Sequence, residues 1–378
     1  AGRCPHCARR CRGYDGGDGV RRWRGLDLGS TRVYLQAKAP RVRCGEHGVV
    51  VAAVPWARHS SRFTRAFEEQ VAWLTAHTAK TTVEVLMRTS WRAVTGIVTR
   101  VVAERGKGLD RLAGLLRVGI DEKSYRRGHK YLTVVVDHDT GRVVWAADKR
   151  DQATVRAFFD ALGPDRTAAL THVSCDGAAW IHDVITERAP QAVICLDPFH
   201  VVAWATTAVD AVRRRTVRDL RGSGESDDAA EVKGTRWAVL KNPENLTSDQ
   251  KTTIAGLAKA NTQLYKAYIA KEQLREIFTI KNDPERKDHA RALFTGLLSW
   301  CDRSRTPEMI KLSATLKRYR ALITNTLDHG LSNALAEATN THINALIRRS
   351  YGFHTPAALI ALIDLTRGGL CPPLPGRS

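Results

Sequence analysis

Hydrophobic and polar residues follow two periods along this chain, one of about two residues and one of about 3.6. Stretches with strand character stand at 116–121, 131–138, 141–149, 171–177 and 192–200. Turn residues join the first three stretches, so we predict three consecutive antiparallel strands. Helical spacing at 153–163 and 178–190 precedes each of the last two strands. The predicted order is therefore three strands, a helix, a strand, a helix and a strand.

That order is the order of a ribonuclease H-like domain. In such a domain, Asp121 on the first strand and Asp176 at the end of the fourth lie side by side. Two carboxylates held a few ångströms apart repel one another unless cations neutralise them, so a divalent metal site is expected. All-oxygen ligands suit Mg²⁺, with Mn²⁺ as a substitute. Two such ions can assist both the attacking and the leaving oxygen of a phosphodiester transfer.

Asp197 also ends a predicted strand, and His200 follows it three residues later. Either Asp197 completes the metal site, or Asp197 and His200 form a structural hydrogen-bonded pair beside it. We favour the structural pair.

A third acid is predicted far along the chain, within the helical pattern at 331–352. One polar stripe of that helix contains a single acid, Glu337, with Asn340 one turn later. Packing of the apolar side on the sheet edge would bring Glu337 to the two aspartates and leave Arg348 and Arg349 near phosphates. The alternative is a solvated helix face, which would be preferred without the upstream aspartates.

The first residues have the ligand spacing of a structural zinc site. The expected ligands of Zn²⁺ are Cys4, Cys7, Cys44 and His47. Two short-spaced pairs on two knuckles are what a tetrahedral zinc requires. Unligated surface thiols are the alternative, and the nearby His6 and Cys11 leave an exchange of one ligand open.

Residues 61–104 have the pattern of a helix-turn-helix. Helical spacing from residue 61 is followed by two short predicted helices, which are separated at Arg88. Ser90 is a suitable N-cap for the second helix, and Arg92 and Arg100 lie on that helix. The first turn of such a helix meets base edges of DNA, and we assign Arg88, Ser90, Arg92 and Arg100 to DNA contact. An ordinary helical hairpin is the alternative.

The composition favours a polyanionic partner. The chain carries 59 Lys+Arg against 39 Asp+Glu, a formal net charge of +20, which favours nucleic acid. We therefore also assign Lys123, Arg126 and Arg127, which follow the first acid, to DNA contact. No apolar run approaches the roughly 18–20 residues of a membrane span, so no membrane partner is expected. A cytoplasmic, nucleoid-associated bacterial protein is the expectation.

The fold class that we predict is α+β and multi-domain. The segment at about 206–328 reads as a helical insertion that shapes a DNA channel or a dimer contact. Trp237 within it is a candidate for stacking on an unpaired base, although burial of its side chain is the favoured interpretation. The predicted parts are a zinc-binding module (1–58), a helix-turn-helix region (59–112), the first part of a ribonuclease H-like core (113–205), the helical insertion (206–328), and C-terminal helices of the core that carry the third acid (329–378).

Together these motifs resemble the DDE transposases of bacterial insertion sequences, and most closely the ISL-three family. The segments that carry the resemblance are CPHC with CGEH, RFTRAFEEQVAWL, GIDEKSYRRGHKY, SCDGAAW, LDPFHVV, GTRWAVLKNPENLT and SNALAEATNTHINALIRRSYGF. The resemblance implies a ribonuclease H-like catalytic domain with a helical insertion, a zinc-bearing module and cut-and-join chemistry on terminal inverted repeats. It also implies the catalytic triad Asp121, Asp176 and Glu337. Asp197 and His200 correspond to the D-x2-H signature of the family, and its SNG is SNA here, ahead of Glu337 and Asn340.

The expected function is that of a transposase that binds the terminal inverted repeats of its own element. We expect it to act on double-stranded DNA as a homo-oligomer, namely a dimer, and to cut and join with Mg²⁺ or Mn²⁺. The alternative is a sequence-specific DNA-binding protein without chemistry, either a regulator or a domesticated transposase. The presence of all three acids argues against such decay.

Overall fold

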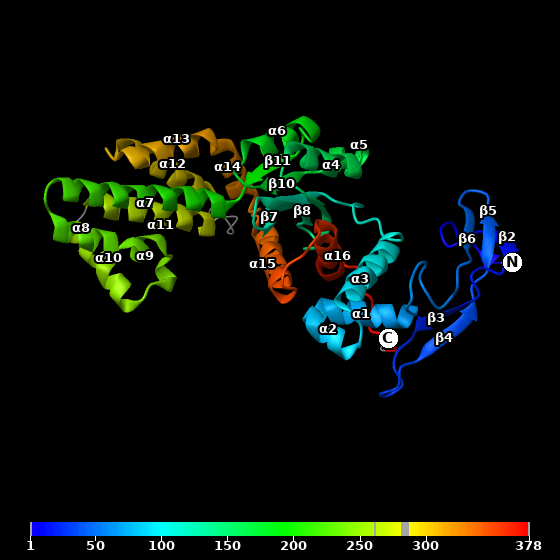
Figure 1. Ribbon diagram of the computed structural model, residues 1–378. Helices are drawn as coiled ribbons and strands as arrows, with labels where there is room; N and C mark the ends of the chain where they lie inside the picture. The colour runs from blue at the N-terminus through cyan, green and yellow to red at the C-terminus, as the bar shows by residue number, and fades with distance from the viewer. Residues whose placement is uncertain (1, 261, 281–286, 377–378) are drawn as a thin grey trace.

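The computed structural model describes residues 2–260, 262–280 and 287–376 (Figure 1). A zinc-module region stands at one end of the molecule, a sheet with helices on both faces lies in the middle, and a helical arm forms the other end. The N-terminal region and the helical arm are thus joined through the sheet.

The first 51 residues form two small sheets. One has the strand order β1-β2-β5-β6, and the other is the hairpin β3–β4. The bounds are β1 (Gly2–Arg3), β2 (Arg10–Asp15), β3 (Val20–Arg24), β4 (Tyr34–Lys38), β5 (Arg41–Cys44) and β6 (Gly48–Val51). The buried apolar cluster in this region consists of Trp23, Ala39 and Ala57. So small a core cannot by itself offset the entropy of ordering the chain, which is the situation in which a structural metal stabilises a fold.

Three helices follow, α1 (Arg65–His77), α2 (Lys80–Leu86) and α3 (Trp91–Gly106). The Ser90 hydroxyl accepts from the backbone N–H of Ala93 at 3.3 Å, so the predicted N-cap of α3 is confirmed. The apolar face of α3, which includes Val94 and Ile97, is buried in the same cluster as residues of α1 and the C-terminal helices.

The central sheet has the order β11-β10-β7-β8-β9. Strands β7, β8 and β9 are antiparallel neighbours, and β10 is parallel to both β7 and β11. The bounds are β7 (Arg117–Arg126), β8 (Lys130–Asp137), β9 (Val143–Asp148), α4 (Gln152–Leu162), α5 (Pro164–Ala169), β10 (His172–Cys175), α6 (Ala179–Arg188) and β11 (Val193–Leu196). The predicted order of elements is observed, with one additional short helix, α5.

Both faces of this sheet are covered by helices. Ile120 and Val135 pack on the face that α4 and α6 cover, whereas Val134 and Val136 pack on the face that carries α3, α15 and α16. Because β8 is buried on both faces, its central residues are continuously apolar instead of alternating.

The insertion is helical, as predicted, and forms the arm of Figure 1. Its first helix, α7 (Pro198–Gly222), starts at the sheet and continues without interruption past residue 206. The other bounds are α8 (Ser226–Gly234), α9 (Arg236–Leu240), a 3-10 turn (Pro243–Asn245), α10 (Ser248–Ala260), α11 (Thr262–Ile280), α12 (Lys287–Arg303), α13 (Pro307–Arg318) and α14 (Arg320–His329). The chain returns to the edge of the sheet through α14, where the Thr326 hydroxyl donates to the carbonyl of Leu196 at 2.7 Å.

Two helices complete the fold, α15 (Ala334–Arg349) and α16 (Pro356–Arg367). Both lie on the face of the sheet opposite α4 and α6 (Figure 1). Among the described helices, none is long and apolar enough to cross a membrane.

Candidate catalytic and DNA-binding sites

Three acids lie at the same level of three neighbouring parallel strands, in the middle of β7 and directly after the ends of β10 and β11. In the sheet register, Ser174 of β10 pairs with Gly119 of β7, and Cys175 pairs with Leu196 of β11. One residue beyond Cys175 and Leu196 come Asp176 and Asp197, and Asp121 lies two residues beyond Gly119. The sheet therefore brings the three carboxylates to the same edge.

The carboxylate of Asp121 has two hydrogen-bond donors. The side-chain amide of Asn340 on α15 donates to Oδ2 at 2.7 Å, and the backbone N–H of Glu122 donates to Oδ1 at 2.7 Å. Burial raises the pKa of Asp121 to about 6, and the charges of Asp176 and Asp197 add to this rise. The carboxylates are therefore close enough to act on one another.

Asp197 and His200 form the hydrogen-bonded pair that was favoured from the sequence. Asp197 is buried at the start of α7, and its Oδ2 lies 3.1 Å from Nδ1 of His200. The hydrogen bond to Asp197 raises the pKa of His200, and the charges of Asp176 and Asp121 act in the same direction. An imidazolium at this position would offset part of the negative charge of the acids.

Glu337 is exposed in the first turn of α15, one turn before Asn340. Asn340 contacts Asp121, so the polar stripe of this helix faces the edge where the acids lie. Among the described residues, the one group of three or more His, Cys, Asp or Glu side chains placed to hold a metal ion is the zinc set. Asp121, Asp176 and Glu337 do not form a second such group in this structure.

A buried polar chain beneath the acids had no signal in the sequence. The Asn333 side-chain oxygen accepts from the Ser174 hydroxyl at 2.8 Å, and this hydroxyl lies 2.7 Å from Nε2 of His138. A Cβ on Gly119 would lie 2.7 Å from the same Asn333 oxygen, so the strand can carry only glycine there without displacing it. The chain ties the start of α15 to β7 and β10.

The four predicted zinc ligands converge. Cys4, Cys7, Cys44 and His47 place their ligand atoms within 4.8 Å of one another, and neither His6 nor Cys11 belongs to this group. The hydrogen bond from His47 lowers the pKa of Cys44 to about 6 and favours the thiolate that a metal binds. The arrangement supports a structural zinc.

The basic residues assigned to the helix-turn-helix divide into two groups. Arg92 is exposed beside the Ser90 cap and is available for base edges. Arg88 instead pairs with Asp27 at 2.6 Å, and Arg100 pairs with Glu68 at 2.6 Å. The guanidinium groups of these two arginines therefore have intramolecular partners.

The remaining basic candidates are similarly divided. Arg126 and Arg127 are exposed at the turn between β7 and β8, next to the half-buried Lys123, and Arg348 is exposed near the end of α15. Arg349 donates to the carbonyls of Thr75 and Ala76 at the end of α1, and burial lowers its pKa.

Trp237 is exposed, so the favoured interpretation of a buried tryptophan is wrong. Its side chain in the short helix α9 is 59% exposed, and the guanidinium of Arg236 lies 4.9 Å from the ring centroid. Helix α9 cannot bury this ring, because its inward positions are taken by Ala238 and Val239. The aromatic face is thus presented on the surface of the arm.

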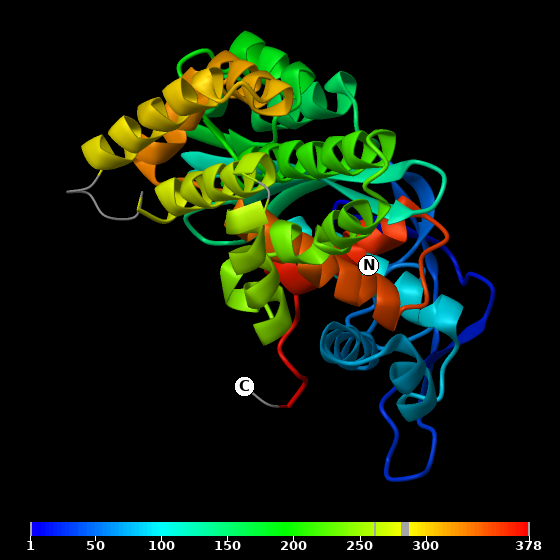
Figure 2. The ribbon, with the colours of Figure 1, turned by 90° about the vertical axis from the view of Figure 1, so that its left-hand side faces the viewer.

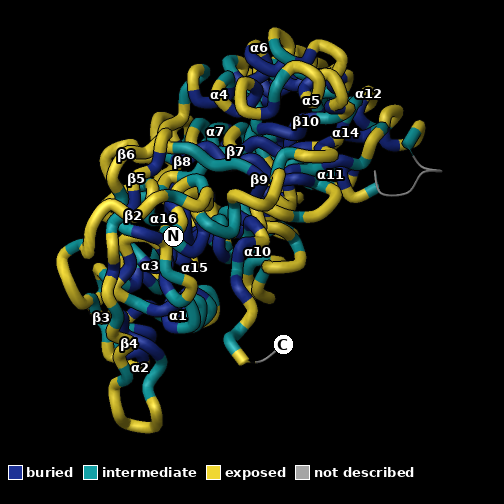
Figure 3. Tube along the Cα trace, turned by 90° about the vertical axis from the view of Figure 1, so that its right-hand side faces the viewer, coloured by how far each residue is buried: buried dark blue, intermediate teal, exposed yellow. Residues whose placement is uncertain are grey.

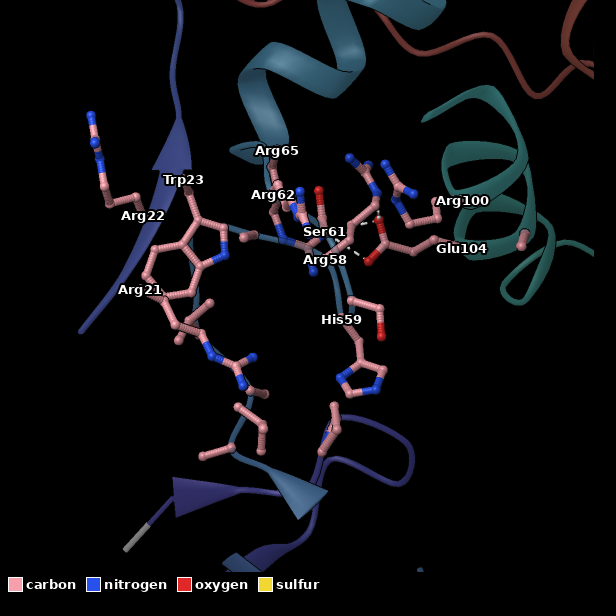
Figure 4. Close-up of a pocket in the computed structure, with 18 of the residues that line it drawn as sticks. Arg21, Arg22, Trp23, Arg58, His59, Ser61, Arg62, Arg65, Arg100 and Glu104 are labelled. Atoms are coloured by element: carbon pink, nitrogen blue, oxygen red, sulfur yellow. Dashed lines mark hydrogen bonds and ion pairs between the residues drawn. The ribbon is translucent and has the colours of Figure 1, made fainter. Parts of the chain in front are cut away.

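A basic cleft of about 660 Å³ lies between the zinc module and helices α1 and α3. Figure 4 shows arginines from both parts around it. Arg58, 5% exposed in its side chain, pairs with Glu68, Glu69 and Glu104 at 3.2, 2.9 and 2.7 Å. Arg58 lies in the segment between the zinc module and α1, so these ion pairs attach that segment to α1 and α3.

Comparison with known proteins gives the family. Three family models match the chain: a transposase model of the ISL3 family over residues 118–363, the zinc-finger of transposase IS204/IS1001/IS1096/IS1165 over 1–47, and the helix-turn-helix domain of transposase family ISL3 over 52–102.

Curated relatives agree with these matches. The transposase for insertion sequence element IS1557 of Mycobacterium tuberculosis is 49% identical over 394 residues, which covers 99% of this chain and 88% of that protein. The transposase for insertion sequence element IS1001 of Bordetella parapertussis is 27% identical over 352 residues, with 93% of this chain and 85% of that protein covered. The sheet, the zinc ligands and these matches together show that this chain belongs to the ISL3 family of DDE transposases.

Proposed function

We propose that this transposase binds the terminal inverted repeats of its own insertion sequence and cuts and joins DNA with divalent metal held by Asp121, Asp176 and Glu337. The catalytic part would be a ribonuclease H-like domain, which is supported by the mixed sheet with its first three strands antiparallel. The observation that carries the proposal is the contact of Asn340 with Asp121, because it turns the face of α15 that bears Glu337 toward the aspartates.

The residues present fit a divalent cation with oxygen ligands. Burial, together with repulsion by Asp176 and Asp197, raises the pKa of Asp121. A cation at the same edge of the sheet would lower this pKa again. The side-chain oxygen of Asn340 is buried without a hydrogen-bond partner. Carboxylate and amide oxygens suit Mg²⁺ or Mn²⁺. When bound, such ions would neutralise charge at the scissile phosphate and favour loss of a proton from the attacking oxygen.

The side chains of this site then have distinct tasks. Asp121 and Asp176 come from adjacent strands and form the fixed part of the site, whereas Glu337 comes from a helix that is tied to the sheet by Asn333. Asn340 holds the orientation of Asp121, and Asp197 holds His200 next to the acids. Asp197 thereby acts as a positioning residue.

The reaction proposed has two phosphoryl transfers. Water attacks a phosphodiester at the element end, and the broken bond leaves a free 3′-hydroxyl. The flanking DNA keeps the 5′-phosphate. The free 3′-hydroxyl then attacks a phosphodiester of target DNA in line: its oxygen bonds to the phosphorus, the 3′-oxygen of the cut target strand leaves, and the proton of the attacking hydroxyl passes by way of solvent to that leaving oxygen. Two ends must be joined to one target, and for this reason we propose that the protein acts as a dimer.

DNA contacts would come from exposed groups around this edge. Arg92, Arg126, Arg127 and Arg348 are free to meet phosphates, which fix register without reading sequence. The exposed ring of Trp237 has the surface needed to stack on an unpaired base.

The test is strand transfer with duplexes that carry the DNA flanking the reading frame. Asp121→Asn should bind these duplexes as wild type does and lose cleavage by on the order of 100- to 1000-fold in either Mg²⁺ or Mn²⁺. Asp160→Asn is the matched control, because Asp160 is a surface acid paired with Arg188, and it should cut normally. Full cleavage by Asp121→Asn would refute the assigned site.

A further inference from the structure

The β3–β4 hairpin is docked on the helix-turn-helix instead of resting within the zinc module. At its base, the backbone N–H of Arg24 donates to the carbonyl of Arg62 at 2.9 Å, and the N–H of Thr64 donates to the carbonyl of Arg24 at 2.9 Å. These bonds join the end of β3 to the residues that lead directly into α1. The hairpin therefore keeps a defined position relative to the DNA-reading helices.

A second set of contacts binds the hairpin to the turn between α2 and α3. Asp27 accepts from Arg24 at 3.1 Å and from Arg88 at 2.6 Å. Arg24 also donates to the backbone carbonyl of Arg88 at 2.7 Å, and Arg88 donates to the carbonyl of Ser30 at 3.0 Å. Arg88 occupies the left-handed region with φ 46°, which aims both its carbonyl and its side chain at the hairpin. We call this set of contacts, Arg24, Asp27, Ser30 and Arg88, the hairpin clamp.

Two members of the hairpin clamp, Arg24 and Asp27, are largely shielded from water, whereas the side chain of Arg88 is 36% exposed. The side chain of Arg24 is 8% exposed and that of Asp27 is 19% exposed. Burial alone would raise the pKa of Asp27, but its hydrogen bonds with Arg88 and Arg24 hold the pKa below the usual value. A shielded, bidentate pairing of this kind fixes geometry more firmly than an exposed ion pair does.

Apart from the contact of the Ser30 carbonyl with Arg88, the tip of the hairpin is open to solvent. Residues 28–32 are all exposed, and Leu28 is 77% exposed. Leu28 and Thr31 exchange two backbone hydrogen bonds, at 2.9 and 3.0 Å, which close a tight turn. Figures 2 and 3 show this tip as an exposed loop that extends past α2. Within the described part of the chain, the guanidinium of Arg32 makes no hydrogen bond or ion pair.

We propose that the hairpin tip is a second DNA-reading element, which places Arg32 in the minor groove next to the major groove entered by the first turn of α3. This inference rests on the proposed binding of element ends. A narrow, A/T-rich minor groove has an enhanced negative potential that attracts an inserted arginine, and Leu28 would contact deoxyribose. The unpaired guanidinium of Arg32 and the net charge of +20 favour double-stranded DNA as the partner of the hairpin tip.

The hairpin clamp holds the tip in a fixed position, which the proposed readout of the minor groove requires. The minor groove distinguishes A·T from G·C pairs by its width and by few base-edge groups, so an arginine there contributes specificity only if its position is fixed. Asp27 is in this view a positioning residue, and Arg88 serves the DNA-reading surface through the hairpin. The recognised sequence would then contain a block read by α3 and an A/T-biased flank read by Arg32.

The inference is tested by selection from a pool of randomised duplexes with the full chain, followed by sequencing. Wild type should select both blocks. Arg32→Ala should keep the block read by α3, lose the A/T bias of the flank and bind the selected duplex about 10-fold more weakly. Arg12→Ala is the matched control, because Arg12 is an exposed arginine on β2 of the other small sheet, and it should select both blocks.

Asp27→Asn tests the clamp separately. It leaves Arg32 in place but should broaden the flank preference as Arg32→Ala does, with zinc content and thermal unfolding close to wild type. Arg32→Ala with an unchanged flank preference, or a wild type without an A/T-biased flank, would overturn the hairpin's role while the proposed transposase function stands. Failure of wild type to select any sequence would overturn both.

Discussion

His138 is a half-buried histidine in the polar chain beneath the acids. It lies at the end of β8, within hydrogen-bond distance of Ser174, and burial lowers its pKa to about 4, with the charge of Arg117 acting in the same direction. The Ser174 hydroxyl donates to Asn333, so its oxygen is left to accept from Nε2–H of His138, and burial favours the neutral imidazole over the charged form.

The folded protein should therefore become less stable as the pH falls, because His138 resists protonation in the folded state. The unfolded chain takes up a proton near pH 6.5 and the folded chain only near 4, so the unfolded state binds more protons within that window. Lowering the pH from 7 to 4.5 should cost on the order of 2 kcal/mol through His138 after allowance for its partial exposure. Thermal unfolding at a series of pH values measures this. His138→Gln should weaken the dependence between pH 6.5 and 4, and an unaltered dependence would contradict the assignment.

At the scale of elements, α15 determines whether the third acid reaches the other two. Its start is held by Asn333, which is 1% exposed, and its first turns are held by the bond from Asn340 to Asp121. Each of these contacts joins two residues that are more than 150 positions apart in the sequence. The helix is therefore a separate part that is docked on the sheet by these polar contacts and by buried apolar residues such as Ile343 and Leu346.

Asn340→Ala should reduce strand transfer by about 10- to 100-fold, because loss of a side chain that orients a metal ligand has effects of this size. DNA binding should stay as in wild type, since Asn340 is half-buried beneath the acids. Asn344→Ala, one turn further along α15, is the control and should retain activity. Equal losses in both variants would indicate that the helix face as a whole is needed, and no loss in Asn340→Ala would contradict the positioning role.

For the molecule as a whole, the zinc module decides whether the DNA-reading surface is complete. The module has a very small apolar core, and it carries the hairpin that docks on the turn before α3. The sheet and the helical arm have their own large apolar clusters and do not depend on it. Loss of zinc should therefore affect DNA binding far more than the stability of the rest.

Cys7→Ser should remove the bound zinc and weaken binding to element-end DNA, with main thermal unfolding unchanged, because only the module loses its folding energy. Cys11→Ser should keep one zinc per chain and normal binding, since Cys11 lies outside the ligand set. Mass spectrometry of the native protein gives the metal content of each variant. Retention of zinc by Cys7→Ser would show that a different set of ligands holds the ion.

Local patterns were sufficient for much of this protein. The zinc ligands, the Ser90 cap, and the order of strands and helices in the sheet depend on spacing within a few residues of each other, so the sequence predicts them. The same holds for the pair of Asp197 and His200, which lie one helical turn apart. In each case the backbone of a single helical turn or a single zinc knuckle fixes where the side chains lie.

Only the tertiary structure decided which polar groups are free and which are engaged. Arg88 in the turn and Arg100 within α3 each have an acid from a distant segment as partner, whereas Arg92 in the first turn of α3 is exposed. Asn333 meets Ser174 across 159 positions of sequence, and Trp237 is exposed because its short helix turns other residues inward. Side-chain partners of this kind depend on how whole elements pack, and no spacing along the chain encodes that packing.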